Sequence, residues 1–502
     1  MVNIPPPAGS IEGLADLRVL TNAAIDVLTE VAAARTGPVA PGGPEAAREF
    51  AREVLTSPLP GRPAADPVAV FTDLVRAYAE WSVDIAHPAA VARMQCPPAS
   101  VAAAAELVTA TLNQSLHAWE SGPFALELER HVVAELAALV GYGPQAGGTL
   151  TAGGSISNLM AVLTARDNVA HRRVGRVPFS TGLAGLGVRP VVLCTDATHF
   201  SLGRAVGIVG LGEDAIVRVP SDALGRLYPD ALEHTIAGLP EDVIPAAVIA
   251  CAGATDQGWV DDLPAIAEVA RRHGIWSHAD AAYGGGVLFS DRMRPMLAGI
   301  EEYDSVTMDL HKFGWTPAST GVFLVRESAS LRHLSAAATT LNNTDDVDAG
   351  FVGLYGDSIQ ATRRVDALKV RATMAVLGRE GLGRMVERCH ELALHAARRV
   401  EAEPRLELAA TPAVSTVLFR YIPRDAAGDG EVDAFTGTLR RQLMLDGRAL
   451  LARSRVRRDD GTAPVYLKLM LLNPATEPGE LDQVLDDVLA TADKVESAAL
   501  PA

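Results

Sequence analysis

Short β-rich apolar runs alternate with helical stretches between residues 147 and 326, and this alternation strongly constrains the fold. Six runs fit buried strands, at 191–195, 215–220, 246–252, 275–280, 305–309 and 321–326. The segment LPAIAEVARRHG lies between two of them and has the apolar spacing of an amphipathic helix, with Gly274 as a favourable C-cap. Strands that alternate with helices predict a mostly parallel sheet with helices on both faces.

The segments on either side of this region have a different character. The first 86 residues contain helical stretches broken by Pro/Gly-rich segments such as TGPVAPGGPE, which predicts a segment that packs on something else, such as a partner subunit. From residue 366 two long helices precede two strand-like runs, STVLFRYIP and PVYLKLMLLNP, that flank a further helix. We therefore expect an N-terminal helical dimerisation segment over 1–86, a large domain over 87–365 and a smaller α+β domain over 366–502.

Composition excludes several classes of function. The chain has 44 basic and 61 acidic residues, a net charge of −17, which argues against binding to nucleic acid or to an anionic membrane. Four scattered cysteines without a CxxC motif fit a reducing cytosol. The N-terminus lacks the basic and apolar regions of a signal peptide, and no apolar run reaches the ~18 residues that span a bilayer. We expect a cytoplasmic protein.

A Gly-Gly-Ser turn in TAGGSISNLMAVLTAR (151–166) leads directly into an amphipathic helix. The free N–H groups at a helix N-terminus, with Ser155 as the cap, form an anion site that suits a phosphate. An ordinary helix cap is the alternative interpretation. In IWSHADAAYGGG, Asp280 ends a predicted strand at the carboxyl edge, where open α/β sheets bind ligands. A carboxylate there serves a ligand or caps the next turn.

Lysine is rare in this chain, with only four among the 44 basic residues. Lys369 falls within a predicted helix, Lys468 within a C-terminal strand and Lys494 near the end of the chain. Lys312 follows the strand of DSVTMDLHKFGW and is the one lysine at the predicted carboxyl edge of the sheet. Partial burial there lowers the pKa of an amine toward the range useful for a Schiff base. The alternative is a solvated loop lysine.

Together these features meet the requirements of pyridoxal 5'-phosphate. Its phosphate needs a helix N-terminus, its aldehyde needs a lysine, and its ring nitrogen needs a carboxylate that keeps the ring protonated. A nucleotide site is less well supported, because GxxxxGK[ST] is absent and no GxGxxG follows the first strand. A metal site is also less well supported, because the twelve histidines include no HExxH.

The same segments resemble the group II pyridoxal-phosphate amino-acid decarboxylases, which include aromatic-amino-acid, glutamate, histidine and 2,4-diaminobutyrate decarboxylases. HADAAYGGG is similar to that family's H-x-DAA-[YF]-GG, DSVTMDLHK to its DS-x-x-x-D-x-HK, and TAGGSISNLMAVLTAR to its phosphate segment. DATHFSLGRAVGIVGLG and SIQATRRVDALKVRATMAVLGREG resemble two further family segments. The resemblance extends from about His87 to the C-terminus.

The resemblance implies the type I fold of pyridoxal-phosphate enzymes, which is like that of aspartate aminotransferase, with the cofactor in the large domain. It also implies a role for each matching residue. Lys312 would bond the aldehyde, Asp280 would pair with the pyridine nitrogen, and His199 would stack on the ring. Gly154 and Ser155 would hold the phosphate, with Asn158 supporting that turn; Thr255 would lie near the ring, and His311 would contact phosphate or substrate.

The resemblance further implies loss of CO2 from an amino acid, and a homodimer with its active site at the interface. In the family, a loop before the last domain often supplies a tyrosine proton donor. The equivalent loop, 335–360, holds Tyr355, which is either that donor or a residue that packs the loop. The chain departs from the family at Ile156, at Ala254–Thr255 where Thr-Thr is usual, and at Lys468 where arginine is usual.

HPAAVARMQCPP and LNQSLHAWESGPFALELE resemble the bacterial diaminobutyrate branch, which favours an aliphatic or polar substrate over an aromatic one. Two alternatives remain open at this point. One is a different pyridoxal-phosphate activity, such as an aromatic-amino-acid decarboxylase, an oxidative aldehyde synthase, an aminotransferase or a carbon–carbon lyase. The other is a binding module that retains the fold without catalysis.

Overall fold

The computed structural model describes residues 5–55, 64–222, 224–334, 344–458 and 460–499. Its large domain is built on a seven-stranded sheet with the strand order β1-β7-β6-β5-β4-β2-β3. The strands are β1 (Gly147–Thr151), β2 (Arg189–Cys194), β3 (Ile216–Arg218), β4 (Val243–Cys251), β5 (Trp276–Ala281), β6 (Ser305–Asp309) and β7 (Gly321–Val325). β3, β2, β4, β5 and β6 are mutually parallel, whereas β7 pairs antiparallel with both β6 and β1. The predicted mostly parallel sheet is confirmed.

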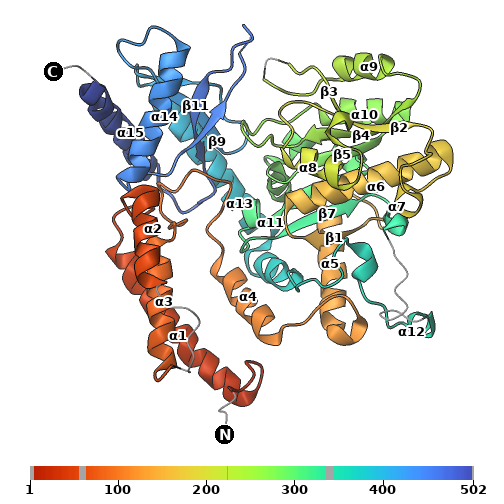
Figure 1. Cartoon of the computed structure of the whole chain (residues 1–502), viewed down its shortest axis with the longest axis horizontal. Helices are drawn as coiled ribbons and strands as arrows, with labels where there is room; N and C mark the ends of the chain where they lie inside the picture. Colours follow the sequence, from red (N-terminus) through yellow and green to blue (C-terminus); the bar gives the residue numbers. More distant parts are fainter. Residues whose placement is uncertain (1–4, 56–63, 223, 335–343, 459, 500–502) are drawn as a thin grey trace.

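The alternating apolar residues of the strands explain why both faces of this sheet are covered. In β2, Val191 and Leu193 belong to one hydrophobic core, while Val192 and Cys194 belong to another. The first core is shared with α5 (Pro123–Val140) and α10 (Leu263–His273), and the second with α6 (Gly154–Val174) and α8 (Ser201–Ile208). Helices therefore lie on both faces, as predicted (Figure 1).

The helix predicted before Gly274 is present as α10. Asp262 caps its first turn by accepting a hydrogen bond from the Ala265 N–H, and Gly274 ends it in the left-handed conformation, with φ of 64°. Two short helices, α7 (Pro178–Thr181) and α9 (Pro229–Ala237), lie in the connections around β2 and β3. Every predicted strand is present, although the run at 215–220 is reduced to the three residues of β3.

The C-terminal domain contains a four-stranded antiparallel sheet in the order β10-β11-β9-β8. Its elements are α13 (Ala367–Glu401), β8 (Leu406–Leu408), β9 (Thr416–Tyr421), α14 (Asp429–Leu445), β10 (Ala452–Arg455), β11 (Val465–Met470) and α15 (Pro478–Ala499). The two helices predicted from residue 366 form α13 together, with Gly378 at a positive φ of 65° as the bend between them. The edge strands β8 and β10 were not predicted.

The helix α13 enters both hydrophobic cores. Leu382 and Val386 pack in the core of the large domain, and Leu392 and Val400 pack in the core of the C-terminal domain. The helix is continuous between these two pairs of residues. The large domain and the C-terminal domain are therefore joined by one helix rather than by a flexible linker.

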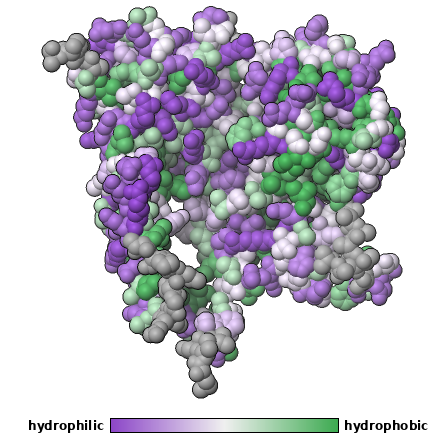
Figure 2. Space-filling view, in the orientation of Figure 1, coloured by the Kyte–Doolittle hydropathy of each residue, from purple (hydrophilic) through white to green (hydrophobic). Residues whose placement is uncertain are grey.

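The N-terminal segment consists of α1 (Ile11–Ala34), α2 (Gly43–Val54) and α3 (Pro67–Trp81), and α4 (Ser100–Leu112) follows it. α1 and α3 pack on each other through a small core of Val27, Val31 and Ala79. Much of their remaining apolar surface is open: Ile11 is 84% exposed and Tyr78 79%. In this view the segment lies beside the C-terminal domain and stands apart from the large sheet (Figures 1 and 2). Each described helix is too short or too polar to cross a lipid bilayer.

Candidate active site

A cavity of about 320 Å³ lies at the carboxyl ends of β4, β5 and β6, beside the N-terminus of α6. This is the edge at which parallel α/β sheets bind ligands. Eight of the residues singled out in the sequence line this cavity together: Gly154, Ser155, Asn158, His199, Thr255, Asp280, His311 and Lys312. Tyr355 is not among the residues that line it. Residues 335–343, the first part of the loop expected to carry that tyrosine, lie outside the described residues.

The turn before α6 presents backbone N–H groups to the cavity. Gly153, at φ of 98°, is the N-cap of α6 and supplies no side-chain cap. Ser155 is thus the second residue of the helix, and our prediction that it caps the helix is wrong, because the turn places a glycine at the cap position. A methyl group on Gly154 would lie 3.0 Å from Ala282 Cβ and 3.2 Å from Asp309 Oδ2. The turn is therefore close-packed and suits an anion at the helix N-terminus.

Asp280 reaches the cavity from the end of β5 and is only 8% exposed. Its Oδ1 accepts a hydrogen bond from the Ala282 N–H at 3.2 Å, and its Oδ2 accepts one from the Asn158 side-chain amide at 2.8 Å. We expected Asn158 to support the phosphate turn. Its side chain instead holds Asp280, because residue 158 lies one helical turn beyond Gly154 and faces the strands.

The Asn158 amide also connects Asp280 to two histidines, directly to His278 and through Ser201 to His199. Its oxygen accepts a hydrogen bond from His278 Nε2 at 3.1 Å, and its Nδ2 also donates to Ser201 Oγ at 3.2 Å. Complete burial lowers the pKa of His278 to about 4, so this ring is neutral at neutral pH. A neutral His278 orients the amide and leaves Asp280 as the charged member of the group.

His199 lies at the cavity wall, next to Ser201. The Ser201 N–H donates to His199 Nδ1 at 3.3 Å, and the Ser201 hydroxyl lies 2.8 Å from the same nitrogen. Burial lowers the pKa of His199, so the neutral ring is favoured, with Nδ1 as acceptor and the proton on Nε2. A neutral, fixed imidazole presents a flat face, which suits stacking on an aromatic ring.

Lys312 lies in α11 (Leu310–Phe313), directly after β6, and its side chain is 17% exposed. Its Nζ lies 3.1 Å from Asp309 Oδ2, while Asp309 Oδ1 is buried and has no hydrogen-bond partner among the described residues. His311 Nδ1 lies 2.9 Å from the Thr320 carbonyl oxygen and 3.2 Å from the Thr320 backbone nitrogen, and its ring lies against the Gly153 turn. The amine is therefore held in place, beside a carboxylate with spare accepting capacity.

Asp256 was not predicted from the sequence; it directly follows Thr255, which lines this cavity. Asp256 Oδ1 lies 2.7 Å from Lys468 Nζ, which belongs to β11 of the C-terminal domain. The Lys468 side chain is 7% exposed and that of Asp256 is 51% exposed. The unusual lysine is therefore a buried cation that the C-terminal domain brings to the edge of the site. Only the presence of Lys468 where arginine is usual could have pointed to this pair.

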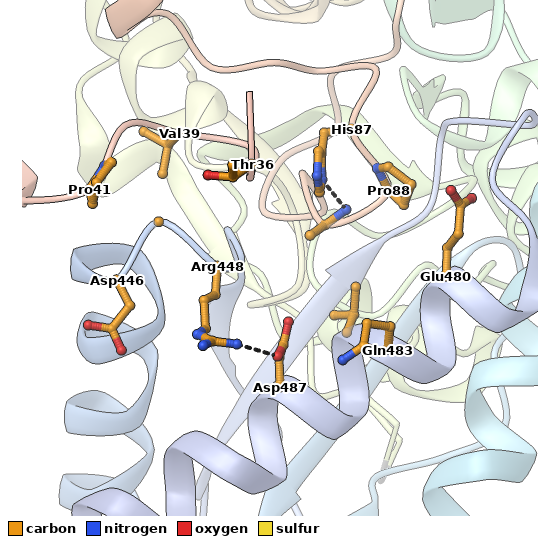
Figure 3. A pocket seen from close by; sticks show the side chains of 13 residues that line it. Thr36, Val39, Pro41, His87, Pro88, Asp446, Arg448, Glu480, Gln483 and Asp487 are labelled. Atoms are coloured by element: carbon orange, nitrogen blue, oxygen red, sulfur yellow. Dashed lines mark hydrogen bonds and ion pairs between the residues drawn. The ribbon is translucent and has the colours of Figure 1, made fainter. Parts of the chain in front are cut away.

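A larger cavity, of about 510 Å³, lies between the N-terminal segment and the C-terminal domain (Figure 3). Arg448 Nη1 donates to Asp487 Oδ1 there at 2.9 Å, and His87 Nδ1 accepts from the Ala89 N–H at 3.1 Å. These side chains already have hydrogen-bond partners within the protein. Lys312 and Asp280 line the smaller cavity, so the smaller cavity is the candidate active site.

The residues of the smaller cavity fit pyridoxal 5'-phosphate. The open N–H groups of α6 suit the phosphate, Lys312 supplies the amine, and Asp280 is a buried carboxylate whose second hydrogen-bond partner is the neutral Asn158 amide. The unpartnered Asp309 Oδ1 leaves room for another donor beside the amine. Fold and site therefore define a pyridoxal-phosphate enzyme of the type I fold.

Comparison with known proteins identifies the family. The model of the pyridoxal-dependent decarboxylase conserved domain matches residues 65–422. An L-2,4-diaminobutyrate decarboxylase of Rhizobium meliloti is 38% identical over 430 residues, which are 86% of this chain and 83% of that protein. A second, from Acinetobacter baumannii, is 32% identical over 455 residues and covers 88% of each chain. This chain belongs to the pyridoxal-dependent decarboxylases.

Solved structures agree with this assignment. The glutamate decarboxylase domain of a diaminobutyrate-pyruvate transaminase and L-2,4-diaminobutyrate decarboxylase from Vibrio parahaemolyticus superposes with a TM-score of 0.86 at 29% identity, over 97% of each chain. The protein is thus a pyridoxal-phosphate-dependent carboxy-lyase that removes CO2 from an amino acid. This confirms the family, the fold class, the cofactor and the activity expected from the sequence motifs. It excludes the alternative of a non-catalytic binding module.

Proposed function

We propose that the enzyme decarboxylates L-2,4-diaminobutyrate or a closely similar aliphatic diamino acid. The two relatives above support this substrate, since both are L-2,4-diaminobutyrate decarboxylases and cover most of the chain. The charges of the site support it as well. Lys468, the cation at the rim, is already paired with Asp256 at 2.7 Å, so an acidic substrate would have to compete with that carboxylate. A cationic side chain can approach the other oxygen of Asp256, to which Lys468 is not bonded.

When bound, pyridoxal phosphate supplies an aldehyde that bonds amines and a ring that accepts the electron pair left by departing CO2. Each lining residue has a defined task in this scheme. Lys312 would hold the cofactor through its amine, which Asp309 keeps in place at 3.1 Å. Asp280, fixed by Asn158, favours a protonated ring nitrogen by its negative charge. His199 would cover one face of the ring and leave the other face open to the substrate.

The remaining lining residues position these groups. Gly154 and Ser155 would offer their N–H groups to the phosphate, His311 lies against the turn at Gly153, and Thr255 lines the cavity. After CO2 departs, a proton must return to the α-carbon. Tyr355 does not line the cavity of its own chain. A proton from this tyrosine would therefore come from the partner subunit's copy of the loop.

A homodimer is part of this proposal, with the active site at its interface. Apolar side chains on α3 recur four residues apart and stay open to solvent: Val70 is 49% exposed, Leu74 50% and Tyr78 79%. Such a stripe on one helix face is typical of a surface covered by another protein. We propose that residues 1–86 cover the partner subunit, that 87–365 bind the cofactor, that 366–502 form the C-terminal domain, and that the enzyme acts in the cytoplasm.

The substrate proposal is tested by supplying the cofactor-loaded enzyme with single L-amino acids and measuring released CO2. The panel contains 2,4-diaminobutyrate, ornithine, lysine, glutamate, cysteine sulfinate and the aromatic amino acids. We expect the highest kcat/KM for 2,4-diaminobutyrate, with 1,3-diaminopropane as the product. A higher kcat/KM for glutamate, cysteine sulfinate or an aromatic amino acid would overturn the substrate proposal.

A further inference from the structure

The two members of the pair Asp256–Lys468 differ in exposure: the lysine side chain is buried, whereas that of the aspartate is half-exposed. The ammonium of Lys468 is almost fully buried, and a buried charge is costly unless it is paired. Asp256 provides the counter-charge through Oδ1 only. Its Oδ2 has no hydrogen-bond or ion-pair partner among the described residues, and about half of the side chain is open to solvent. One carboxylate thus stabilises the buried amine and keeps an accepting oxygen free.

The position of Asp256 connects this free oxygen with the substrate cavity. Cys251, Gly253, Ala254 and Thr255 line the cavity, and Asp256, which is not itself a lining residue, directly follows Thr255 in the same loop. The negative charge of Asp256 also acts on His199, whose pKa it raises against the larger opposite effect of burial. Since His199 itself lines the cavity, the field of Asp256 extends into the space where a substrate side chain would lie.

We infer that Asp256 is a specificity-determining residue, which binds the distal ammonium of a diamino substrate through its free carboxylate oxygen. This inference rests on the proposed function, because it concerns the side chain of the substrate in the same site. The reacting groups stay as described, while Asp256 adds a charge-assisted hydrogen bond at the rim. Lys468 then serves to hold the Asp256 carboxylate in a fixed orientation.

The alternative role of Asp256 is that of a counter-charge for Lys468 alone. The two roles predict different behaviour toward ligands that differ only in the distal group. L-homoserine carries a hydroxyl where L-2,4-diaminobutyrate carries its ammonium, and 3-aminopropan-1-ol is related in the same way to 1,3-diaminopropane. A carboxylate that binds the distal group distinguishes the members of each pair. A counter-charge for Lys468 does not.

The test compares D256N with the wild-type holoenzyme. We expect the kcat/KM ratio of diaminobutyrate to homoserine to fall on the order of ten- to a hundredfold, which corresponds to a hydrogen bond between charged groups. The kcat/KM for homoserine itself should stay within about threefold, since the hydrogen bond to the ammonium is what the substitution weakens. D196N is the control, because Asp196 is an exposed aspartate that pairs with Arg218 and is not adjacent in the chain to a residue that lines the cavity.

Inhibition constants of 1,3-diaminopropane and 3-aminopropan-1-ol give a readout that needs no turnover of either substrate. The wild type should bind the diamine more tightly, and D256N should lose this preference. In a K468M background, D256N should still abolish the preference for the diamine over the amino alcohol. An equal loss for both members of a pair, an unchanged ratio, or an effect that disappears with K468M would overturn the inference. Absence of CO2 from diaminobutyrate would instead refute the proposed substrate, while the inhibitor pair would still test Asp256.

Discussion

Asn158 and Asp280 lie 122 residues apart in the chain, and the amide of the first donates to Oδ2 of the second at 2.8 Å. The same amide accepts from His278 on the strand that carries Asp280. Asp280 is therefore held by two neutral donors, this amide and the Ala282 N–H, and its negative charge can serve the ring nitrogen. A salt bridge at this place would have weakened that charge, whereas an amide fixes it without neutralising it.

The first prediction concerns this amide. N158L removes the donor to Asp280 and leaves His278 Nε2 without its acceptor. Because the carboxylate loses a hydrogen bond that favours its charged form, we expect the affinity for pyridoxal phosphate to fall on the order of tenfold or more. A titration of cofactor absorbance measures it. N168L is the control, because Asn168 is buried on the same helix but donates to Thr164 and Ser330. Equal affinities of N158L and wild type would contradict the prediction.

A second prediction identifies the amine. K312A should lose the yellow absorbance of the bound aldehyde, and borohydride should leave no reduced cofactor on its peptides. In the wild type, peptide mass mapping should place the reduced adduct at residue 312. K494A, at an exposed lysine of α15, should keep both signals. An adduct on Lys369 or Lys468 in the wild type would refute the assignment.

The third prediction concerns the proton returned to the α-carbon. If the partner subunit's loop supplies it through Tyr355, Y355F should slow amine formation by about a hundredfold or more. It should also raise the share of substrate that is oxidised by O2, measured as aldehyde formed against amine formed. Y228F, at a half-exposed tyrosine before α9, should leave the partition unchanged. If Y355F gave the same ratio of aldehyde to amine as the wild type, Tyr355 would only pack the loop.

Subunit association provides the fourth prediction. I25E and Y78E each place a charge on the exposed apolar surface of α1 or α3, where Ile25 is 54% exposed. Burying that charge in an interface is costly, so we expect monomers by light scattering and loss of activity. E49K changes an exposed charge on α2 and should remain dimeric. Dimers of unchanged affinity in both apolar-surface variants would exclude this surface as the interface.

The fifth prediction is a dependence of stability on pH. The folded state lowers the pKa of His278 from 6.5 to about 4, so the unfolded chain binds the proton more readily. The stability that His278 contributes is complete above pH 6.5 and is lost as the pH falls toward 4. At pH 5 this loss amounts to about 2 kcal/mol.

H278N cannot bind that proton, so its denaturant midpoint should fall less than that of the wild type between pH 7.5 and pH 5. H131N, at an exposed histidine, should follow the wild type. Parallel pH profiles of H278N and wild type would mean that His278 is already protonated in the folded enzyme.

The sequence predicted those parts of the site that are coded by contiguous motifs. A strand followed by Asp280, a strand followed by Lys312 and a glycine turn before a helix are local patterns, and the parallel sheet brings their ends to one edge. Asp256 was missed because its partner, Lys468, lies 212 residues away and no spacing in the sequence connects the two. The backbone angles of a glycine turn decide which of its residues caps the helix, and the sequence does not specify them. This explains the wrong prediction for Ser155.

The unpredicted strands have a common physical cause. β8 and β10 are the edges of the small sheet, and β1 is an edge of the large one, so each pairs on one side only. Edge strands need less apolar periodicity than central ones, and β1 contains two glycines at its start. Their register is set by their neighbours rather than by their own residues.

The unbroken passage of α13 from one core into the other has a mechanical consequence. A helix that is anchored in both cores transmits displacement along its length, so the C-terminal domain cannot swing independently at the boundary between them. We therefore expect Lys468 on that domain and Thr255 on the other to keep a nearly constant separation during turnover. Heating should also melt the two cores in one cooperative step, since neither retains its packing once this helix frays.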